Sequence, residues 1–474
     1  MWTRRVLGMA GSLCLLAGLA TCPAFATDSE LSLTEAVLQA LDGNLDLVAR
    51  RRALDADREE IDLALAALLP QIDVGARAQI IESERSDDKR GVNTKESVLL
   101  GAGLQQVLYD ENSWARYQIQ KQVYAAQVQD LESFRLGVVR DAADAFLALD
   151  QAKVVLEIQQ RNREVTRRNL ETSRARIVAG WSSDREVLRW ESQLAGNDGA
   201  VRVGHVAVLQ SQFELNRVRN RPPEGAIAPQ SVSVGEYGFV YSRDSIAKAI
   251  AAPDEDRRMR DFLVRLGLGR SPDLLALDAD IAAQERQLTA SKRAFWVPSL
   301  SVGAGVDYLA AGGSGRSADF NQTEWGARGL LTFPLLQGGA KFAGLRQSRD
   351  SLASLRVQKG ATAQSVEQAT RAAMAQASGA YANISFAQRE FAAARRNFEL
   401  VDASYILGVA SILDVLDAQN QLLSAELAVA QALYGFLQDL VAAELQLAYF
   451  PFLEPVGEVE ELLDALERAL GVTP

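Results

Sequence analysis

The side chains whose types and spacing suggest chemistry in this sequence are carboxylates beside two predicted turns. Asp414 and Asp417 are three residues apart, so they share one face of a helix. Copies of such a pair around one axis would attract cations and repel each other. Asp414 also follows Ser411 with the spacing of a capping box, as Glu186 follows Ser183, so both acids have an alternative role as helix caps.

The turns themselves are marked by glycine and serine. Gly180 opens the first turn, over 180–184, and Gly408 opens the second, over 408–412. A serine then precedes the next helical stretch in each case, as is typical of a helix start. We therefore expect two helical hairpins whose ends carry the acidic residues.

Catalytic and metal-binding chemistry finds little support. His205 is the only histidine and Cys14 and Cys22 are the only cysteines, so a metal site built from these residue types is nearly excluded. A catalytic triad could use only His205, which lies beside Gly204 in a helical stretch with no neighbouring motif. The net charge of −11 argues against binding to duplex nucleic acid. We expect no enzyme activity, catalytic residue, cofactor or resident metal.

Residues 1–26 are predicted to be a secretory signal peptide. A basic pair and an apolar stretch over 6–20 precede the cleavage motif Ala24-Phe25-Ala26. Two alternatives stay open, a lipoprotein signal ending at Cys22 and a twin-arginine signal. Cleavage after the motif removes both cysteines, so the mature chain would enter an oxidising compartment without a disulfide and depend on burial for its stability.

Two proline-free regions, 71–221 and 335–450, are candidates for very long helices. A continuous helix from Glu111 to Ala179 would reach ~100 Å. The second region contains a heptad seam over four heptads, with apolar residues spaced alternately by four and three. Its members are Ala373, Ala377, Ala380, Ile384, Ala387, Phe391, Ala394, Phe398 and Val401. The pattern predicts a coiled-coil tube rather than a globular core.

Four segments instead alternate apolar residues with polar residues or glycine. They span 71–80, 97–104, 299–308 and 324–333. Each is near the ~9–11 residues of a tilted transmembrane strand. A soluble sheet with one wet face would alternate in the same way, but the signal peptide favours the membrane. Because four strands cannot close a barrel and lipid does not tolerate an open sheet edge, several copies must share one barrel.

The two halves of the chain repeat each other. Pro298 follows Pro70, and Gly408 follows Gly180, by the same offset. Each half reads helix, strand, loop, strand, long helix, turn, long helix. The predicted divisions are a first repeat over 27–220, a surface linker over 221–243, a second repeat over 244–450 and an acidic tail over 451–474 with a helix at 456–470.

Several short segments, in this order along the chain, resemble one known family. They are Leu33-Thr34-Glu35-Ala36 with Asn44-Leu45-Asp46-Leu47, Leu68-Leu69-Pro70, the run from Pro334 to Gly339, Tyr405-x-x-Gly408, and the run from Leu413 to Ala418. The sequence from about 31 to 450 thereby resembles the TolC-type outer-membrane efflux proteins. Leu336 and Gln337 depart from the family's strand-to-helix signature. Each segment alone is weak evidence for the resemblance, whereas the ordered set is specific to the family.

The resemblance implies a mainly α-helical chain with membrane β-structure. It implies a homotrimer whose four strands per chain close a twelve-stranded outer-membrane barrel, continued through the periplasm by a long α-helical barrel. Such proteins are passive exit ducts of tripartite efflux or type I secretion systems. The implied partners are a periplasmic adaptor (membrane fusion) protein, an inner-membrane pump and outer-membrane lipid. Whether the cargo is a drug, a metal or a secreted protein is not indicated.

The resemblance also assigns roles at the periplasmic tip. Asp414 and Asp417 match aspartate rings at a tunnel constriction. Tyr405 matches a tyrosine that tethers the closed state, and Glu186 is its expected hydrogen-bond partner. Ala410 stands where some members carry a tethering arginine, so we expect a weaker or differently built tether, with Arg185 as one candidate cation.

The expected adaptor contact lies at the same tip, at Gly180, Ser183, Gly408 and Ser411. The alternative to a duct is a periplasmic coiled-coil structural or adaptor protein, which also carries long helical hairpins. Adaptors have soluble β parts and lack two separated hairpins of transmembrane type. The sequence therefore favours the duct.

Overall fold

The computed structural model of the chain describes residues 30–82, 96–178, 183–249, 252–312 and 322–471. The predicted signal peptide and Gly180 lie outside these residues. The first half contains α1 (Leu33–Gly43), α2 (Leu45–Ala66), β1 (Gln71–Ile80), β2 (Glu96–Tyr109), α3 (Glu111–Val178) and α4 (Asp184–Val218). The second half contains α8 (Pro272–Arg293), β3 (Ser299–Gly312), β4 (Thr323–Thr332), α9 (Ala340–Ile406) and α10 (Ile412–Leu447).

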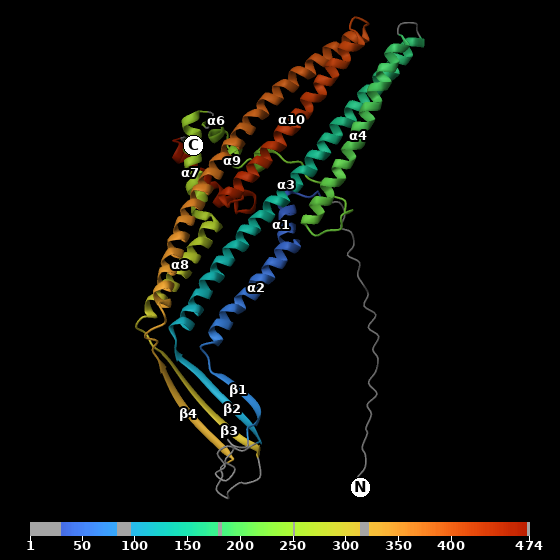
Figure 1. The fold of residues 1–474 in the computed structure, drawn as a ribbon. Helices are drawn as coiled ribbons and strands as arrows, with labels where there is room; N and C mark the ends of the chain where they lie inside the picture. Colours follow the sequence, from blue (N-terminus) through green and yellow to red (C-terminus); the bar gives the residue numbers. More distant parts are fainter. Residues whose placement is uncertain (1–29, 83–95, 179–182, 250–251, 313–321, 472–474) are drawn as a thin grey trace, which may run out of the picture.

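The remaining described elements connect the two halves or follow them. Between the halves lie α5 (Val234–Tyr237), η2 (Phe239–Ser242), α6 (Asp244–Ala249) and α7 (Pro253–Arg270). The chain then ends with η3 (Pro451–Leu453) and α11 (Val456–Leu470). In Figure 1, α6 and α7 lie beside the long helices, about halfway along the molecule.

The predicted repeat is confirmed in its element order. The series α2, β1, β2, α3, α4 returns as α8, β3, β4, α9, α10. The two longest helices have 68 and 67 residues, α3 and α9 respectively, so each extends ~100 Å. Both helical hairpins run away from the strands toward one end of the molecule (Figure 1). The heptad seam in α9 is buried or half-buried at all nine positions, and α9 packs along α10.

The strands form one antiparallel sheet in the order β1-β2-β3-β4. Its middle pair, β2 and β3, joins the two repeats. Glycines opposite charged residues let those side chains lie across the neighbouring strand: a Cβ on Gly103 would stand 2.9 Å from the Asp73 carboxylate. All of β1 and β4 is exposed, including Val74 and Trp325 at 82% and 81%.

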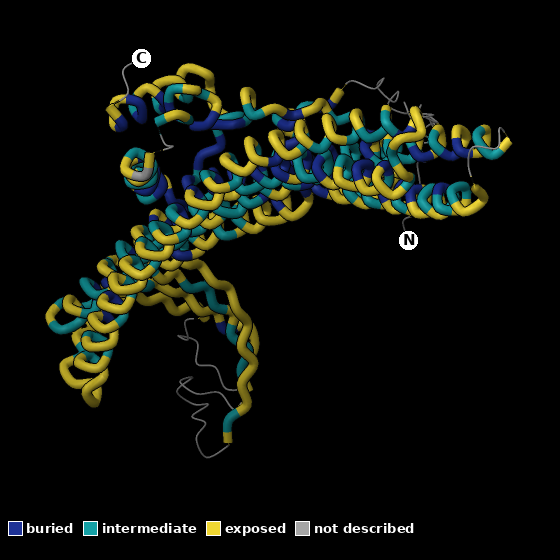
Figure 2. Tube along the Cα trace, turned by 90° about the horizontal axis from the view of Figure 1, so that it is seen from above, coloured by how far each residue is buried: buried dark blue, intermediate teal, exposed yellow. Residues whose placement is uncertain are grey.

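The main hydrophobic core lies midway along the helices, where buried residues gather in Figure 2. The expected surface position of 221–243 is wrong for its second half, because Phe239, Val240 and Tyr241 are buried in this core. Asp150 of α3 holds the same segment by accepting hydrogen bonds from Tyr434 Oη at 2.6 Å and from the Val232 backbone at 3.4 Å.

The C-terminal helix α11 covers one side of this core. Leu463, Leu466 and Leu470 of the predicted apolar stripe are buried, whereas Val456 is 74% exposed. The exposed Asp464 pairs with Arg243 at 2.6 Å. The arginine lies outside the tail in sequence, so the pattern of the helix alone did not indicate this pair.

Candidate functional site

The second hairpin turn is shaped by one glycine and one capping box. Gly408 has φ +77°, a conformation that suits a residue without a Cβ. Ser411 then caps α10: the backbone N–H of Asp414 donates to Ser411 Oγ, and the backbone N–H of Ser411 donates to the Asp414 carboxylate at 2.9 Å. The capping role of Asp414 is therefore confirmed.

The first hairpin differs. Ser183 has the extended backbone of an N-cap residue, but its side chain makes no capping hydrogen bond to α4. The Glu186 carboxylate accepts a hydrogen bond from the Tyr405 hydroxyl. The S-x-x-acid spacing predicts the cap correctly in one repeat only, because a turn must also orient the serine.

Asp414 and Asp417 lie on the exposed face of α10, while Val415 and Ala418 of the opposite face are buried. The Ser411 hydroxyl and backbone N–H lower the pKa of Asp414 from its ordinary value. Asp417 accepts a hydrogen bond from Gln421 at 2.7 Å. The two carboxylates share a face, as their spacing predicts.

Tyr405, near the end of α9, joins the two hairpins. Its hydroxyl donates to the Glu186 carboxylate, the contact that the sequence led us to expect. It also accepts from Trp190 Nε1 at 3.3 Å, and the two rings are 6.4 Å apart. Burial, together with Glu186, raises the pKa of Tyr405 above its ordinary value, so the phenol keeps its proton and donates.

The cation beside Tyr405 comes from Arg176 of α3 rather than from Arg185, which is exposed. Arg176 Nη2 donates to the backbone oxygens of Tyr405 at 2.9 Å and Ile406 at 2.8 Å. Its Cζ lies 4.6 Å from the centre of the Tyr405 ring. The last turn of α9 has no basic residue of its own, so Arg176 supplies the positive charge that a helix C-terminus favours.

We call the contacts of Tyr405 with Arg176, Glu186 and Trp190 the Tyr405 tether. It connects α9 with both helices of the first hairpin. Sequence reasoning missed Arg176 and Trp190. Trp190 lies four residues after Glu186 and so shares its helix face, which is a weak signal. An arginine in the last turn of α3 is so common at helix ends that it points to no particular partner.

A buried polar cluster lies further along the same helices. Thr166 Oγ1 of α3 accepts from Asn197 Nδ2 of α4 at 2.8 Å and from Gln419 Nε2 of α10 at 2.7 Å. All three side chains are buried. Asn197 lies between Gly196 and Gly199, and α4 runs through these positions without a break. Asn197 joins α4 to α3 within the first hairpin, and Gln419 joins this hairpin to α10 of the second.

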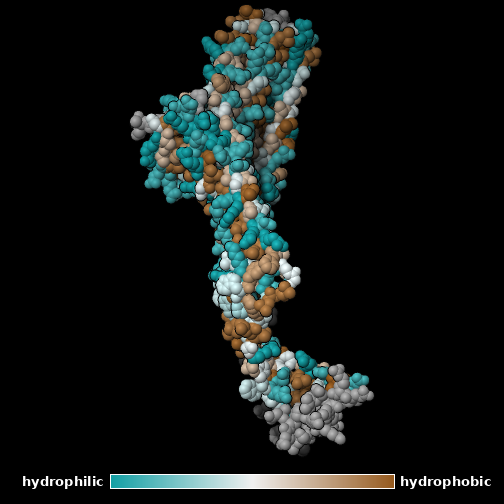
Figure 3. Space-filling view, turned by 60° about the vertical axis from the view of Figure 1, so that its left-hand side comes forward, coloured by the Kyte–Doolittle hydropathy of each residue, from teal (hydrophilic) through white to brown (hydrophobic). Residues whose placement is uncertain are grey.

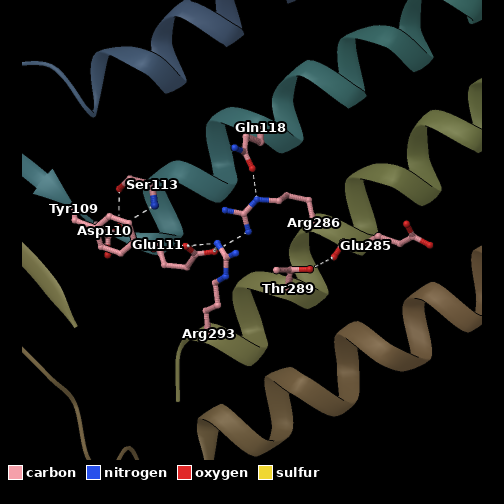
Figure 4. Close-up of polar contacts among 9 residues, drawn as sticks. All are labelled: Tyr109, Asp110, Glu111, Ser113, Gln118, Glu285, Arg286, Thr289 and Arg293. Carbon is pink, nitrogen blue, oxygen red and sulfur yellow. Dashed lines mark hydrogen bonds and ion pairs between the residues drawn. The ribbon is translucent and has the colours of Figure 1, made fainter. Parts of the chain in front are cut away.

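A second polar cluster holds the junction between strands and helices (Figure 4). Glu111, the first residue of α3, is only 6% exposed and pairs with Arg286 at 2.8 Å and Arg293 at 3.3 Å, both from α8. Tyr109 Oη donates to it at 2.7 Å, and Gln118 contacts Arg286. Hydrophobic residues gather on the surface near this end of the long helices (Figure 3). Trp296, which follows α8, is 66% exposed.

Two negative findings concern the described residues only. No described helix is both long and apolar enough to cross a membrane. Nor do the described ranges contain a group of three or more His, Cys, Asp or Glu side chains placed to hold a metal ion.

The fold of paired long hairpins on a small sheet, with a tethered tip, is that of an efflux channel. The family model described as "Outer membrane efflux protein" matches residues 36–217 and 263–447, and the chain belongs to this family. It is therefore an outer-membrane protein that acts as an exit channel. This membership favours the duct over the periplasmic adaptor, and the members compared are channels rather than enzymes.

Individual relatives agree with this family. Outer membrane protein TolC of Salmonella enteritidis is 25% identical over 417 residues, which cover 86% of this chain and 79% of TolC. Outer membrane efflux protein BepC of Brucella suis is 23% identical over 407 residues, covering 85% and 82%. The crystal structure of VceC from Vibrio cholerae superposes with a TM-score of 0.71 at 16% identity, covering 89% of this chain and 97% of VceC.

Proposed function

We propose that three copies of this chain form the outer-membrane exit duct of a tripartite efflux or type I secretion system. The observation that carries the proposal is the sheet, in which β1 and β4 each have one edge without a partner among the described strands. These strands are exposed on both faces and carry large apolar side chains such as Ile72 and Leu331. An edge of this kind is stable in lipid only when another copy pairs with it.

In this proposal the strands of three copies close one twelve-stranded barrel, and the helices form a tube that continues it through the periplasm. The apolar face of each strand then contacts outer-membrane lipid. The domain division follows the two repeats, 27–220 and 244–450, with 221–243 joining them and 451–474 packing as a tail outside the tube.

The tip is proposed as the gate. The Tyr405 tether ties the end of α9 to the first hairpin and so opposes separation of the two hairpin tips. Six carboxylates, from Asp414 and Asp417 of three copies, would form rings at the constriction and favour cations. The turns at Gly180, Ser183, Gly408 and Ser411 are proposed to contact a periplasmic adaptor, which couples the duct to an inner-membrane pump.

Exposed apolar residues support a protein contact at this tip. Leu407 and Val409 beside Gly408 are 79% and 82% exposed. Apolar side chains that face water in the free tip would be covered by the ends of adaptor helices.

The proposal is tested with the full-length protein purified in detergent. Its molar mass, measured by light scattering, is expected to be three times that of one chain, and it should form ion-conducting channels in planar bilayers. A monomer that conducts no ions would contradict it.

A further inference from the structure

Glu444 is a buried acid that the duct and its gate do not use. It lies in the last turn of α10 and is 2% exposed. Its Oε2 atom has no hydrogen-bond partner. Burial raises the pKa of this carboxyl well above its ordinary value and so favours its protonated form. A buried carboxyl without a partner costs stability, so its presence calls for an explanation.

Glu444 is part of the wall of a cavity of about 290 Å³ between α5, η2, the end of α10 and α11. Three aromatic side chains, Tyr237, Phe239 and Phe452, contribute to the same wall. Other acidic residues line it as well, namely Glu236, Glu454 and Glu460. None of the described residues that line the cavity is a lysine, arginine or histidine.

The end of α10 adds to this negative character. The last carbonyl groups of a helix carry partial negative charge, and the last turn of α10 has no basic residue to balance it. The neighbouring arginines have other partners. Arg270 stacks on Tyr449 at 4.7 Å, and Arg243 pairs with Asp464 and Glu467. The cavity thus combines acids, a helix C-terminus and aromatic faces without a cation.

We propose that this cavity binds a small organic cation of the alkylammonium class, with Glu444 as its counter-charge and Tyr237, Phe239 and Phe452 around its carbon atoms. Aromatic faces attract such cations. The volume is at the lower end of the range for ligand sites, so the ligand is small. A bare metal ion fits less well, because the aromatic walls offer it no ligand atoms.

Binding should release a proton, because a cation beside Glu444 favours the ionised carboxylate. The other titratable groups around the site are not expected to supply this proton. Glu236 of α5, with Glu454 and Glu460 near α11, are exposed at its rim, and Tyr449 carries no charge at neutral pH. Arg270 of α7 stays on the Tyr449 ring. The proton therefore comes from Glu444.

The test is calorimetric titration of the full-length protein in detergent with choline. The wild type should bind choline and release roughly one proton, measured by repeating the titration in two buffers of different ionisation enthalpy. Glu444→Gln should bind at least ~10-fold more weakly and release none. Glu461→Gln, an exposed acid of α11 outside the cavity, is the matched control and should behave as the wild type.

A second variant separates loss of the site from loss of the fold. Phe452→Leu keeps Glu444 and should weaken choline binding while the release of a proton persists. The inference is overturned if the wild type binds no choline at 10 mM, a concentration ~10-fold above a millimolar Kd, or if Glu444→Gln binds it equally well. Binding of Mg²⁺ in place of choline would also overturn it.

Discussion

At the scale of single residues, the proposed gate depends on how one tyrosine, Tyr405, is held. Tyr405 touches side chains from α3 and α4, and its own backbone oxygen is bound by Arg176. Ala410 stands where the resemblance places a tethering arginine in some members, yet the Arg176 guanidinium reaches the end of α9 from α3. The tether is therefore built differently from the pattern implied by the family, and it lies within one copy of the chain.

Arg176→Ala should loosen this tether. A hydrogen bond that involves a charged group contributes about 1.5–3 kcal/mol, and at this half-exposed site the lower value predicts a ~10-fold shift toward the open gate. Single-channel recordings in planar bilayers should show a larger open fraction. Arg185→Ala, which removes an exposed arginine near the same turn, is the control. An unchanged open fraction in Arg176→Ala would show that the tether does not restrain the gate.

Asp414→Ala combined with Asp417→Ala should reduce cation selectivity and block by added cations. The reason is the loss of six carboxylates at the proposed constriction. The reversal potential under a salt gradient measures this cation selectivity. Since Asp414 also caps α10, Ser411→Ala serves as a control that weakens the cap and keeps both charges. Selectivity equal to the wild type in the double variant would place the constriction elsewhere.

At the scale of elements, two polar clusters set how the hairpins and strands are joined. Thr166, Asn197 and Gln419 connect three helices through short hydrogen bonds in a buried position. Such contacts fix the rotation of each helix, since an unpaired polar group inside the bundle would be costly. Glu111 likewise fixes α3 relative to α8, at the junction between the strands and the helices.

Glu111→Gln should lower the thermal stability at pH 7. Removing one partner of a buried ion pair leaves two arginines without their counter-charge, and the loss is roughly 3 kcal/mol. The apparent unfolding temperature in detergent, followed by circular dichroism, measures the change. Glu285→Gln, which disrupts an exposed pair with Arg356, should lower the free energy of unfolding by less than about 1 kcal/mol.

The same variant predicts a pH dependence. Burial raises the pKa of Glu111, but the Tyr109 hydroxyl and Arg286 outweigh burial, and the net pKa is below its ordinary value of 4.5. A carboxyl group whose pKa is lowered in the folded state stabilises the fold above pH 4.5. This stabilisation is lost as the pH falls below 4.5. The difference between wild type and Glu111→Gln should therefore shrink below pH 4.5. A difference that stays constant down to pH 3 would contradict the ion-pair account.

At the scale of the whole molecule, the chain is elongated, and the sheet at one end has two edges, β1 and β4, without a partner among the described strands. The core lies at the middle of the helices (Figure 2), whereas β1 and β4 are exposed along their whole length. A single copy therefore leaves β1, β4 and their apolar side chains uncovered. In the proposed trimer, the neighbouring copies cover these strand edges and form a tube.

Introduced cysteines can test this association. The predicted mature chain has none, so Val74→Cys in β1 with Ala327→Cys in β4 provides the only reactive thiols. A flexible bis-maleimide should then produce cross-linked bands of two and three chains in denaturing gels and none larger. Each single-cysteine variant should remain monomeric in the gel. Bands that continue beyond three chains would contradict a closed trimer.

The sequence alone determined the elements and their order. The strands follow from alternation, the long helices from the absence of proline, and the cap at Ser411 from residues three positions apart. The repeat offset predicted two equivalent hairpins, and the structure contains them. The alternation and the cap depend on residues a few positions apart, and the proline-free regions and the repeat offset are read directly from the sequence, so none of them requires knowledge of the fold.

The tertiary structure decided which distant residues meet. Arg176 contacts Tyr405 across 229 positions, and Gln419 reaches Thr166 across 253. The burial of Phe239 in a segment expected on the surface, and of Glu444 beside a cavity, likewise depends on how the helices are rotated and packed. Periodicity shows which face of a helix is apolar, but a contact also requires the position of its partner, which only the packed chain defines.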